Sequence, residues 1–571
     1  MAGLYGVIST KKQDIKEIYT NFFSSTLDNT INEEFKYKNF IYGRSVIDKF
    51  LNDRVLYEDE TIIIGFEGVF YNKVTKKSYE TIIQWYHNDG IDFVQNIRGQ
   101  FCGFIYDKNI DKLYIFNDSL STKPLYIYKN NDVFMFASEL KVITKLLSQL
   151  SIEKIWDHDA VYSMLTVGHM LNDLTYEKNT KKLNYATIFE IDKHFNMEER
   201  QYFNFCKKEN FDLSKEQIIE KIDELLISSV KECWAKDDEY NYKHYTFLSG
   251  GLDSRVNLFL AKEQGYMDVL TMTFSQSGSS DEKIAQEIAS KEGFKHFFYA
   301  LDNGKFLEKE IERYIEANDG LTIFNGAAAG YDYLSSINHT DFGALHTGQI
   351  GDLLFGSYVK KYFTVDNSAI SDQTQLVQEI TFFEDYAIKY KNNSELFGYE
   401  QRVINGTLNG DRTATHFTDM LSPFYNRSLM EFCLTIPDVF KKDEAIYLDW
   451  FNNKHKQISN YKWDSAGVKP KSIILVKYAK QFKRYKNAFL RRVGLKVDNM
   501  NPFDMWLRNN KKILKNLDVL YFTHINDIED INLQKLLKNM YNCDIKHNHY
   551  GSNNKFLVIT VLLSYKLHMK G

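Results

Sequence analysis

Two glycine-rich segments of this chain each place one aspartate after an apolar run. The first, Ser249–Ser254, follows the apolar run His244–Leu248 and opens an apolar-periodic segment, so it predicts a strand, a tight loop and a helix start. Adjacent glycines let backbone N–H groups approach an anion, the two serines offer hydroxyls, and Asp253 is placed to hold Mg²⁺. The segment predicts a phosphate loop, not of the Walker type because no Gly-Lys-Ser/Thr follows. The alternative is an ordinary turn with Asp253 as the helix N-cap.

The second segment, Thr347–Asp352, has the same arrangement. Two glycine-rich strand ends that each carry a carboxylate suit a Mg²⁺-bound polyphosphate, because hard cations need several oxygen ligands. We predict that Asp253 and Asp352 share the metal; the alternative is that Asp352 only caps a helix. A strand at Val269–Phe274 also ends in small polar residues and could form an adenosine pocket. The predicted nucleotide-binding residues are Leu248, Ser249, Gly250, Gly251, Asp253, Ser254, Thr273, Phe274, Ser275, Thr347, Gly348 and Gln349.

Helices and strands alternate from about residue 216, which predicts a doubly wound parallel sheet with its ligands beyond the carboxyl ends of the strands. The expected elements are a helix at Lys215–Cys233, the strand and helix around the first loop, the strand Val269–Phe274, a helix at Ser280–Gly293 and an apolar segment at Phe297–Leu301. The chain after about residue 400 is expected to be mostly helical, with a buried helix at Phe556–Leu563. The region 470–517 is rich in Lys and Arg with interspersed aromatic residues, typical of a solvated face or a substrate-contacting surface.

The first 200 residues look β-rich, with helices at Tyr79–His87 and Ser138–Leu147, which predicts an α+β layered domain. The expected strands include Thr61–Gly65, Phe101–Tyr106, Lys112–Phe116, Leu125–Tyr128 and Val133–Ala137. The predicted domains are therefore 1–202 and 216–571, joined by a polar linker at 203–215.

Composition narrows the function classes. The chain has 571 residues, 44% of them apolar, and a formal net charge of −5 with a pI near 6.3, which argues against nucleic acid as a partner. Five scattered cysteines fit a reducing compartment better than a disulfide framework. The sequence shows neither a signal peptide nor an apolar run long enough to cross a bilayer, so we expect a cytoplasmic protein without membrane contact.

Several motifs, in order and spacing over nearly 470 residues, resemble the asparagine synthetase family. They are Met1–Gly6, Gly68–Asn72, Arg98–Phe104, Lys123–Tyr126, Phe136–Glu139, Ser249–Ser254, Thr273–Ser275, Thr347–Asp352 and Ser422–Asn426. The resemblance implies an N-terminal glutaminase-type αββα sandwich of the Ntn class. It also implies a C-terminal synthetase domain of the ATP-pyrophosphatase type, which uses ATP and Mg²⁺ to adenylate a carboxylate and releases AMP and pyrophosphate.

The N-terminal half departs from the family at positions that carry glutaminase chemistry. Ala2 stands where glutamine-using members have the nucleophilic cysteine. Glu67 stands in the Asn-Gly oxyanion element, where a carboxylate would repel the developing oxyanion. The aspartate that grips the glutamine amine is replaced by Ser78 or Lys77, while Arg44 matches the arginine for the glutamine carboxylate. These losses predict that the chain does not hydrolyse glutamine.

The synthetase half keeps the metal aspartate but has Gln349 and Leu353 where asparagine synthetases have glutamates. This combination resembles the branch of β-lactam synthetases and lasso-peptide cyclases, which lack the thiol and form an amide with another amine. We therefore expect an amide-forming ligase that acts on a peptide or small metabolite, favouring intramolecular ring closure in natural-product biosynthesis. The alternatives are use of ammonia from an external source and a non-catalytic scaffold in a biosynthetic cluster. Partner proteins of such a cluster and a homodimer are left open.

A cation and a base remain to be assigned for this chemistry. The family uses a lysine to neutralise charge as pyrophosphate leaves, and its counterpart lies in the segment Trp463–Lys471. Lys469 is the choice by spacing, with Lys471 second, so the predicted catalytic residues are Lys469, Asp352 and Asp253. The general base is not visible in the sequence; Tyr331 and Tyr333 lie between the relevant loops, but neither is selected.

Overall fold

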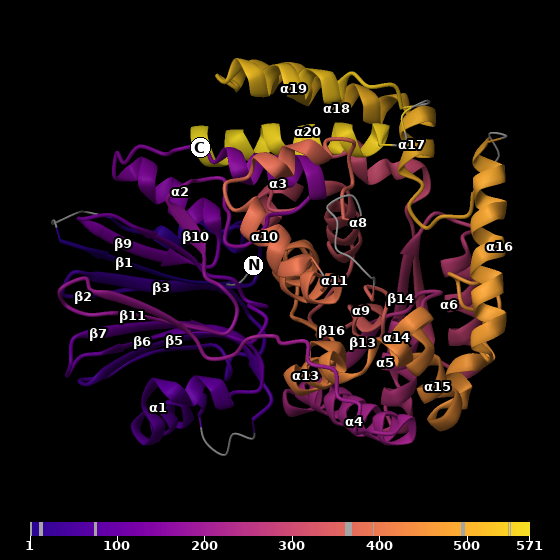
Figure 1. Cartoon of the computed structure of the whole chain (residues 1–571). Helices are drawn as coiled ribbons and strands as arrows, with labels where there is room; N and C mark the ends of the chain where they lie inside the picture. The colour runs from indigo at the N-terminus through magenta and orange to yellow at the C-terminus, as the bar shows by residue number, and fades with distance from the viewer. Residues whose placement is uncertain are drawn as a thin grey trace.

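The computed structural model describes residues 3–10, 15–72, 77–359, 368–391, 393–492, 497–545, 548 and 550–571. Figure 1 shows a β-rich N-terminal half beside a half built on a parallel sheet, with α18, α19 and α20 above them. Within these residues, we find no helix that is both long and apolar enough to span a bilayer.

The N-terminal half is a sandwich of two antiparallel sheets. The order in the first is β10 (Thr180–Lys182), β8 (Tyr126–Lys129), β9 (Val133–Ala137), β1 (Gly3–Ser9), β3 (Phe40–Ile47) and β2 (Thr30–Tyr37). The order in the second is β12 (Met197–Gln201), β11 (Thr187–Ile191), β7 (Lys112–Asn117), β6 (Gly99–Asp107), β5 (Ile62–Phe70) and β4 (Val55–Glu58). Alternate residues of both sheets, such as Phe40, Phe104 and Phe136, fill the space between them.

Helices cover both outer faces of this sandwich. The helix α1 (Ser78–Asp89) packs on the outer face of the second sheet, where its Ile82 joins Phe66 and Phe70. The helices α2 (Leu140–Gln149) and α3 (His158–Val167) lie beyond the first sheet in Figure 1. The predicted Ntn-type αββα sandwich is confirmed. The strand Val133–Ala137 has its predicted bounds, and the other four predicted strands and the two predicted helices are found with shifted ends.

The C-terminal half contains a five-stranded parallel sheet, confirming the doubly wound ATP-pyrophosphatase type of fold. Its order is β15 (Lys295–Ala300), β14 (Val269–Ser275), β13 (Lys243–Phe247), β16 (Phe342–His346) and β17 (Met420–Leu421). The strand order reverses between β13 and β16. Ligands of such sheets bind beyond the carboxyl ends of the strands at this switch point, and both glycine-rich loops leave the sheet there.

Helices surround this sheet and continue to the C-terminal end, as predicted. Those before residue 400 are α4 (Lys215–Glu239), α5 (Asp253–Glu263), α6 (Ser280–Glu292), α7 (Ile311–Asn318), α8 (Phe324–Leu334), α9 (Gly351–Leu354), α10 (Phe383–Tyr390) and α11 (Ser394–Phe397). Later ones are α12 (Leu408–Asp411), α13 (Arg427–Thr435), α14 (Asp438–Lys441), α15 (Ala445–Lys454), α16 (Ile473–Arg492), α17 (Phe503–Asn509), α18 (Lys511–His524), α19 (Ile531–Tyr541) and α20 (Gly551–Tyr565). The apolar segment Phe556–Leu563 lies in α20 and is buried, as predicted.

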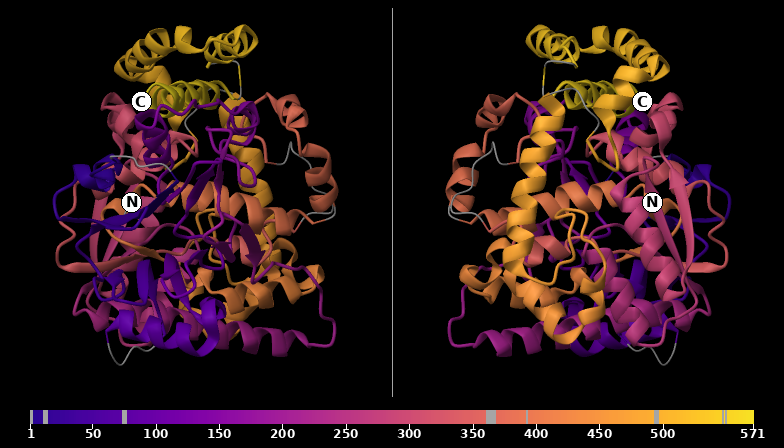
Figure 2. Two further views of the ribbon diagram at one scale, coloured as in Figure 1. Left: turned by 90° about the vertical axis from the view of Figure 1, so that its left-hand side faces the viewer. Right: turned by 90° about the vertical axis from the view of Figure 1, so that its right-hand side faces the viewer.

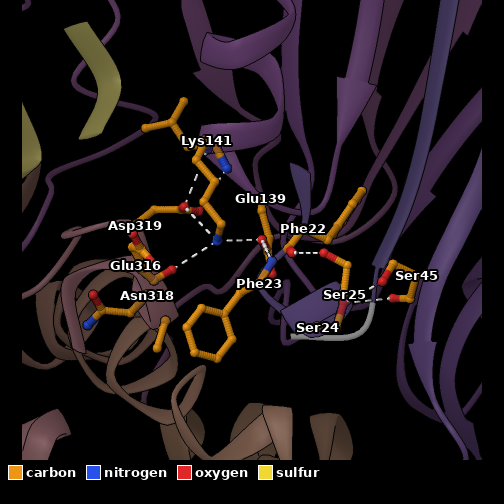
Figure 3. A network of polar contacts seen from close by, with 12 residues as sticks. Phe22, Phe23, Ser24, Ser25, Ser45, Glu139, Lys141, Glu316, Asn318 and Asp319 are labelled. Carbon is orange, nitrogen blue, oxygen red and sulfur yellow. Dashed lines mark hydrogen bonds and ion pairs between the residues drawn. The ribbon is translucent and has the colours of Figure 1, made fainter. Parts of the chain in front are cut away.

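Buried polar contacts join the two halves. Figure 3 shows Lys141, at the start of α2, between Glu139 and Asp319. Its ammonium donates to the Glu316 carbonyl at 2.9 Å, and Asp319 accepts the Leu140 N–H at 2.8 Å. The segment between β12 and α4 forms no helix or strand, yet Phe203 and Phe205 in it are buried. The start of the predicted linker region is therefore packed against the rest of the chain.

Candidate functional site

The first glycine-rich loop connects β13 to α5 and is held by its own side chains. The Ser254 hydroxyl accepts the Ser249 N–H at 3.1 Å, and the Ser249 hydroxyl accepts the Gly251 N–H at 3.1 Å. The Gly250 N–H donates to the Asp281 carboxylate at 3.1 Å. The loop is thus preformed, and a phosphate would take over N–H donors that these side chains now satisfy.

The second loop, between β16 and α9, touches the first so closely that only glycine fits. A Cβ atom on Gly348 would lie 2.2 Å from the Asp253 carbonyl carbon, and one on Gly351 would lie 2.6 Å from the Asp253 Cγ. Between them Ile350 has a φ of +64°, a left-handed conformation that costs energy for a β-branched residue. Such strain is typical of loops whose geometry is set by function.

The two predicted metal ligands lie at this contact. The Asp253 carboxylate accepts the Asp352 N–H at 2.9 Å and the Tyr447 hydroxyl at 3.1 Å. Neither aspartate is a helix cap: Leu252 is the N-cap residue of α5 and Ile350 that of α9, without side-chain cap bonds. The alternative roles as simple caps are therefore wrong.

The electrostatics of this pair suit a divalent cation. Burial, followed by repulsion from Asp352, raises the pKa of Asp253 well above its usual range. A bound cation would remove this repulsion, and Asp352 is exposed toward solvent, from which Mg²⁺ would arrive. The Thr347 hydroxyl is buried beside the loop and has no hydrogen-bond partner among the described residues. The donor set therefore fits Mg²⁺ with a phosphate group.

A cavity of about 400 Å³ opens beside the first loop and includes both strand ends that were predicted to bind nucleotide. It is lined by Phe247, Leu248, Ser249, Gly251, Met272, Thr273, Phe274, Asp281, Asp464, Asp498, Asn499 and Met500. Of the other predicted residues, Ser275 bonds Ser279 through their hydroxyl groups at 2.8 Å and does not line this cavity. Thr347, Gly348 and Gln349 lie instead on the Asp253 side of the loop contact.

Three carboxylates of the cavity, Asp281, Asp464 and Asp498, were not assigned from the sequence. Burial and the nearby Asp464 raise the pKa of Asp281 to about 6. Asp464 itself is fixed by its N–H, which donates to the Gly250 carbonyl at 2.9 Å. Asp281 stands among acids in the first turn of α6, an ordinary helix signal, so the sequence could not distinguish it.

A second cluster joins Gln349 to Asp411 and Tyr425. The Gln349 amide donates to Asp411 at 2.7 Å, and the Tyr425 hydroxyl bonds both Asp411, at 3.0 Å, and the Gln349 carbonyl oxygen. Burial raises the pKa of Asp411 to about 7. A carboxyl group poised near neutral pH is suited to take up and release protons. Asp411 has no local sequence signal, because its partners come from loops far away in the chain.

The two tyrosines considered as bases lie elsewhere. The Tyr331 hydroxyl accepts the Arg313 Nε–H at 2.8 Å. Tyr333 is buried among aromatic rings, 5.2 Å from the Phe274 ring, and its hydroxyl has no hydrogen-bond partner within the described residues. Neither contacts the Gln349 cluster through a described hydrogen bond.

The candidate lysines lie shortly after Asp464, which lines the cavity. Lys469 and Lys471 are exposed, and no described hydrogen bond or ion pair engages either side chain. They follow the turn in which Trp463 pairs with Val468, and Asp464 of this turn is bonded to the phosphate loop. The structure thus places their segment beside the loop, while the catalytic assignment of Lys469 stays a prediction.

Glu67, which stands in the position of the family's oxyanion element, belongs to a buried ion cluster. Arg54 donates to Glu67 at 3.0 Å and to Asp419 at 2.6 Å, and Lys123 pairs with both carboxylates. Glu67 is therefore a structural ion-pair partner that links the sandwich to the residue preceding β17. Arg44 donates to the Arg54 carbonyl at 2.7 Å, the Ser78 hydroxyl is buried, and Lys77 lies over the Tyr79 ring. Ala2 falls outside the described residues.

Comparison with known protein families divides the chain into the same two halves as the structure. Residues 57–203 match the glutamine amidotransferase domain family, and residues 221–398 match the asparagine synthase family. The chain is thus similar to the asparagine synthetase family.

Individual relatives are distant. The chain is 28% identical over 295 residues to an asparagine synthetase of Bacillus subtilis, covering 46% of this chain and 37% of the relative. It is 26% identical over 331 residues to a Methanocaldococcus jannaschii protein whose asparagine synthetase name is provisional, covering 54% and 62%. It is 22% identical over 394 residues to asparagine synthetase B of Escherichia coli, covering 63% of each chain. In each case the match covers less than two thirds of the relative.

Proposed function

We propose that this chain is an ATP- and Mg²⁺-dependent carbon–nitrogen ligase that adenylates a substrate carboxylate and couples it to an amine. The observation that carries the proposal is the contact of two glycine-rich loops at the switch point, with Asp253 and Asp352 beside a cavity of about 400 Å³. Named relatives are asparagine synthetases, which supports the same chemistry.

The first step forms an acyl-adenylate. A substrate carboxylate oxygen attacks the α-phosphorus of ATP, and pyrophosphate leaves. The Ser249–Ser254 loop would bind the phosphates, and Asp253 and Asp352 would hold Mg²⁺, which supplies charge neutralisation for pyrophosphate. Lys469 would add positive charge as negative charge develops.

The second step forms the amide bond. The amine nitrogen attacks the acyl carbon, AMP leaves, and the surplus proton of the amine must go to a base. We assign this base to Asp411, oriented by Tyr425 and Gln349, because its raised pKa lets it accept a proton near neutral pH. The Asp411 cluster takes the place of the tyrosines that the sequence left open.

Glutamine is not the nitrogen donor in this proposal. Ala2 provides no thiol, and Glu67 is engaged by Arg54 and Lys123 in an ion cluster without solvent exposure. The amine then comes from the substrate, and we favour intramolecular closure of a peptide or small metabolite. The proposal of intramolecular closure rests on Ala2 and Glu67 and on Gln349 and Leu353, which stand where asparagine synthetases have glutamates.

Binding of ATP with Mg²⁺, followed by isothermal calorimetry, tests the first step before any substrate is known. We expect the wild type to bind in a Mg²⁺-dependent manner and Asp352→Asn to lose at least 10-fold in Mg²⁺-dependent affinity. Asp341→Asn is the matched control, because Asp341 is an exposed aspartate in a surface ion pair with Lys243. ATP binding that is equal in all three proteins would refute the metal assignment, and no binding to the wild type would favour the scaffold alternative.

A second candidate uses free ammonia or an external amine. A cavity of about 250 Å³ lies between the halves and is lined by Tyr71, Gln100, Asp118 and Cys233 together with Tyr425 of the proposed base cluster. An amine entering from the sandwich side would meet Tyr425 there. Pyrophosphate release from a plain carboxylic acid that rises with ammonium concentration would favour this candidate over intramolecular closure.

A further inference from the structure

The helix α16 has an apolar face that points away from the protein. Figure 2 shows α16 running along the outside of the molecule in its right-hand view, with no element drawn over it. Six large apolar side chains on this helix are between 51% and 71% exposed: Ile474, Leu475, Tyr478, Phe482, Tyr485 and Phe489. We call these six residues the α16 stripe. Val476, by contrast, is buried against the protein.

The spacing of the stripe makes it a continuous surface. With about 100° of rotation per residue, the six side chains fall within an arc of about 100°, the width of a helix face that is normally covered. Single exposed apolar residues are common, but six in one stripe are not, and such patches mark interaction sites. The apolar face of α16 is thus as wide as a helix face that is normally buried, but it is exposed to solvent.

The charge of α16 restricts what can cover the stripe. From Lys471 to Arg492 the sequence has no Asp or Glu but contains Lys471, Lys477, Lys480, Lys483, Arg484, Lys486, Arg491 and Arg492. Lys477, Lys480 and Lys483 already pair with Asp443, Glu444 and Asp464. Arg484 and Lys486 have no ion pair within the described part of the chain, so positive charge borders the stripe.

The same helix is attached to the candidate active site. The Lys480 ammonium lies 3.9 Å from the centre of the Trp463 ring, and Lys483 donates to the Asp464 carbonyl at 2.5 Å. Asp464 lines the cavity of the candidate nucleotide site. The face of α16 opposite the stripe therefore contacts the turn that lines that cavity.

We propose that the α16 stripe docks an acidic amphipathic helix of another polypeptide. Apolar residues of that helix would cover the stripe, and its carboxylates would meet Arg484 and Lys486. A second copy of α16 would oppose like charges, and the chain's net charge of −5, with Asp443 beside the helix, disfavours an anionic membrane. This inference concerns binding and does not depend on the proposed ligase activity.

The test measures binding of a fluorescent synthetic peptide with leucine at a and d heptad positions and glutamate elsewhere. Its control peptide carries lysine in place of every glutamate. We expect the full-length protein to bind the acidic peptide, less tightly as salt is raised, and not the basic one. Phe482→Glu and the double change Arg484→Glu, Lys486→Glu should each weaken binding at least 10-fold.

Phe522→Glu on α18 is the matched control variant, because Phe522 is 69% exposed on a different helix. It should bind the acidic peptide like the wild type, and all variants should keep the wild-type melting temperature. Equal binding of both peptides, or an unaffected Phe482→Glu variant, would overturn the proposal. So would stripe-dependent sedimentation with phosphatidylglycerol vesicles, or a dimer in light scattering that Phe482→Glu converts to monomer.

Discussion

At the scale of single residues, the buried surroundings of Asp411 set the pKa of its carboxyl group. Its carboxyl group has two polar partners, Gln349 and Tyr425, and both come from motifs that leave the parallel sheet. Burial opposes its ionisation, so its pKa rises from 3.8 to about 7. The residue can therefore change protonation in the pH range in which amines are deprotonated by a protein base.

This environment predicts a pH-dependent second step. With a carboxylate substrate that supports pyrophosphate release, amide formation should rise with pH through about 7 and then level off, because only ionised Asp411 accepts a proton. Asp411→Asn should abolish this rise and lower amide formation by about 100-fold or more, within the range for a general base. ATP–pyrophosphate exchange, which reports the first step, should persist.

Asp385→Asn is the control for this experiment, because Asp385 is an exposed aspartate on α10. An unchanged pH profile in Asp411→Asn would exclude the base assignment. A loss of exchange and amide formation together would instead make Asp411 a structural residue.

At the scale of elements, the candidate site depends on two loops that approach so closely that no methyl group fits between them. The loop after β13 supplies Asp253, the loop after β16 supplies Asp352, and Gly348 lies against the backbone between Asp253 and Ser254. Parallel pairing of β13 with β16 brings the two loops to one edge of the sheet. The strained Ile350 shows that the second loop is held in a specific conformation.

Gly348→Ala should separate the two loops. Its Cβ would meet the Asp253 carbonyl carbon at 2.2 Å, so backbone must move. We expect Mg²⁺-dependent ATP binding to weaken at least 10-fold, measured by calorimetry. Gly326→Ala on α8 is the matched control: nothing lies within 4 Å of the added Cβ, and alanine favours a helix by about 0.5–1 kcal/mol. Equal ATP binding in both variants would contradict a functional contact between the loops.

For the whole molecule, the buried ion cluster of Arg54, Glu67, Lys123 and Asp419 links the sandwich to the parallel sheet. Burial opposes ionisation of Asp419, but Arg54 and Lys123 outweigh it and lower its pKa to about 2. Each member is buried, so removing one leaves an uncompensated charge among the other three. Glu67 is thus part of the contact between the halves.

Asp419→Asn should therefore destabilise the protein by about 3–5 kcal/mol, seen as a lower melting temperature in calorimetry. Asp341→Asn, at an exposed ion pair, should change it little. Because the folded-state pKa of Asp419 is lowered, its stabilisation is complete above about pH 4 and is lost as pH falls from 3.8 toward about 2. The difference in unfolding free energy between wild type and Asp419→Asn should shrink as the pH falls over that range. A difference that stays constant would show that the charge of Asp419 is not the cause.

The sequence by itself determined the local features of this protein. Paired glycines after apolar runs predicted both loops, and alternation of strands and helices predicted the parallel sheet, because these signals depend on neighbouring residues alone. The same reasoning identified the likeness of both halves to one family, and the structure confirms their fold classes. It also supported Asp253 and Asp352 as a pair, since both follow parallel strands.

The tertiary structure decided which distant groups meet. Asp411, Asp281 and Asp464 have no local pattern that marks them, because their raised pKa values or contacts arise from burial and from loops distant in sequence. Glu67 could be recognised as a departure, but its pairing with Arg54 and Lys123 required the folded sandwich. The sequence also could not predict that the α16 stripe is exposed. Apolar periodicity defines one face of a helix, but it does not say whether other parts of the protein cover that face.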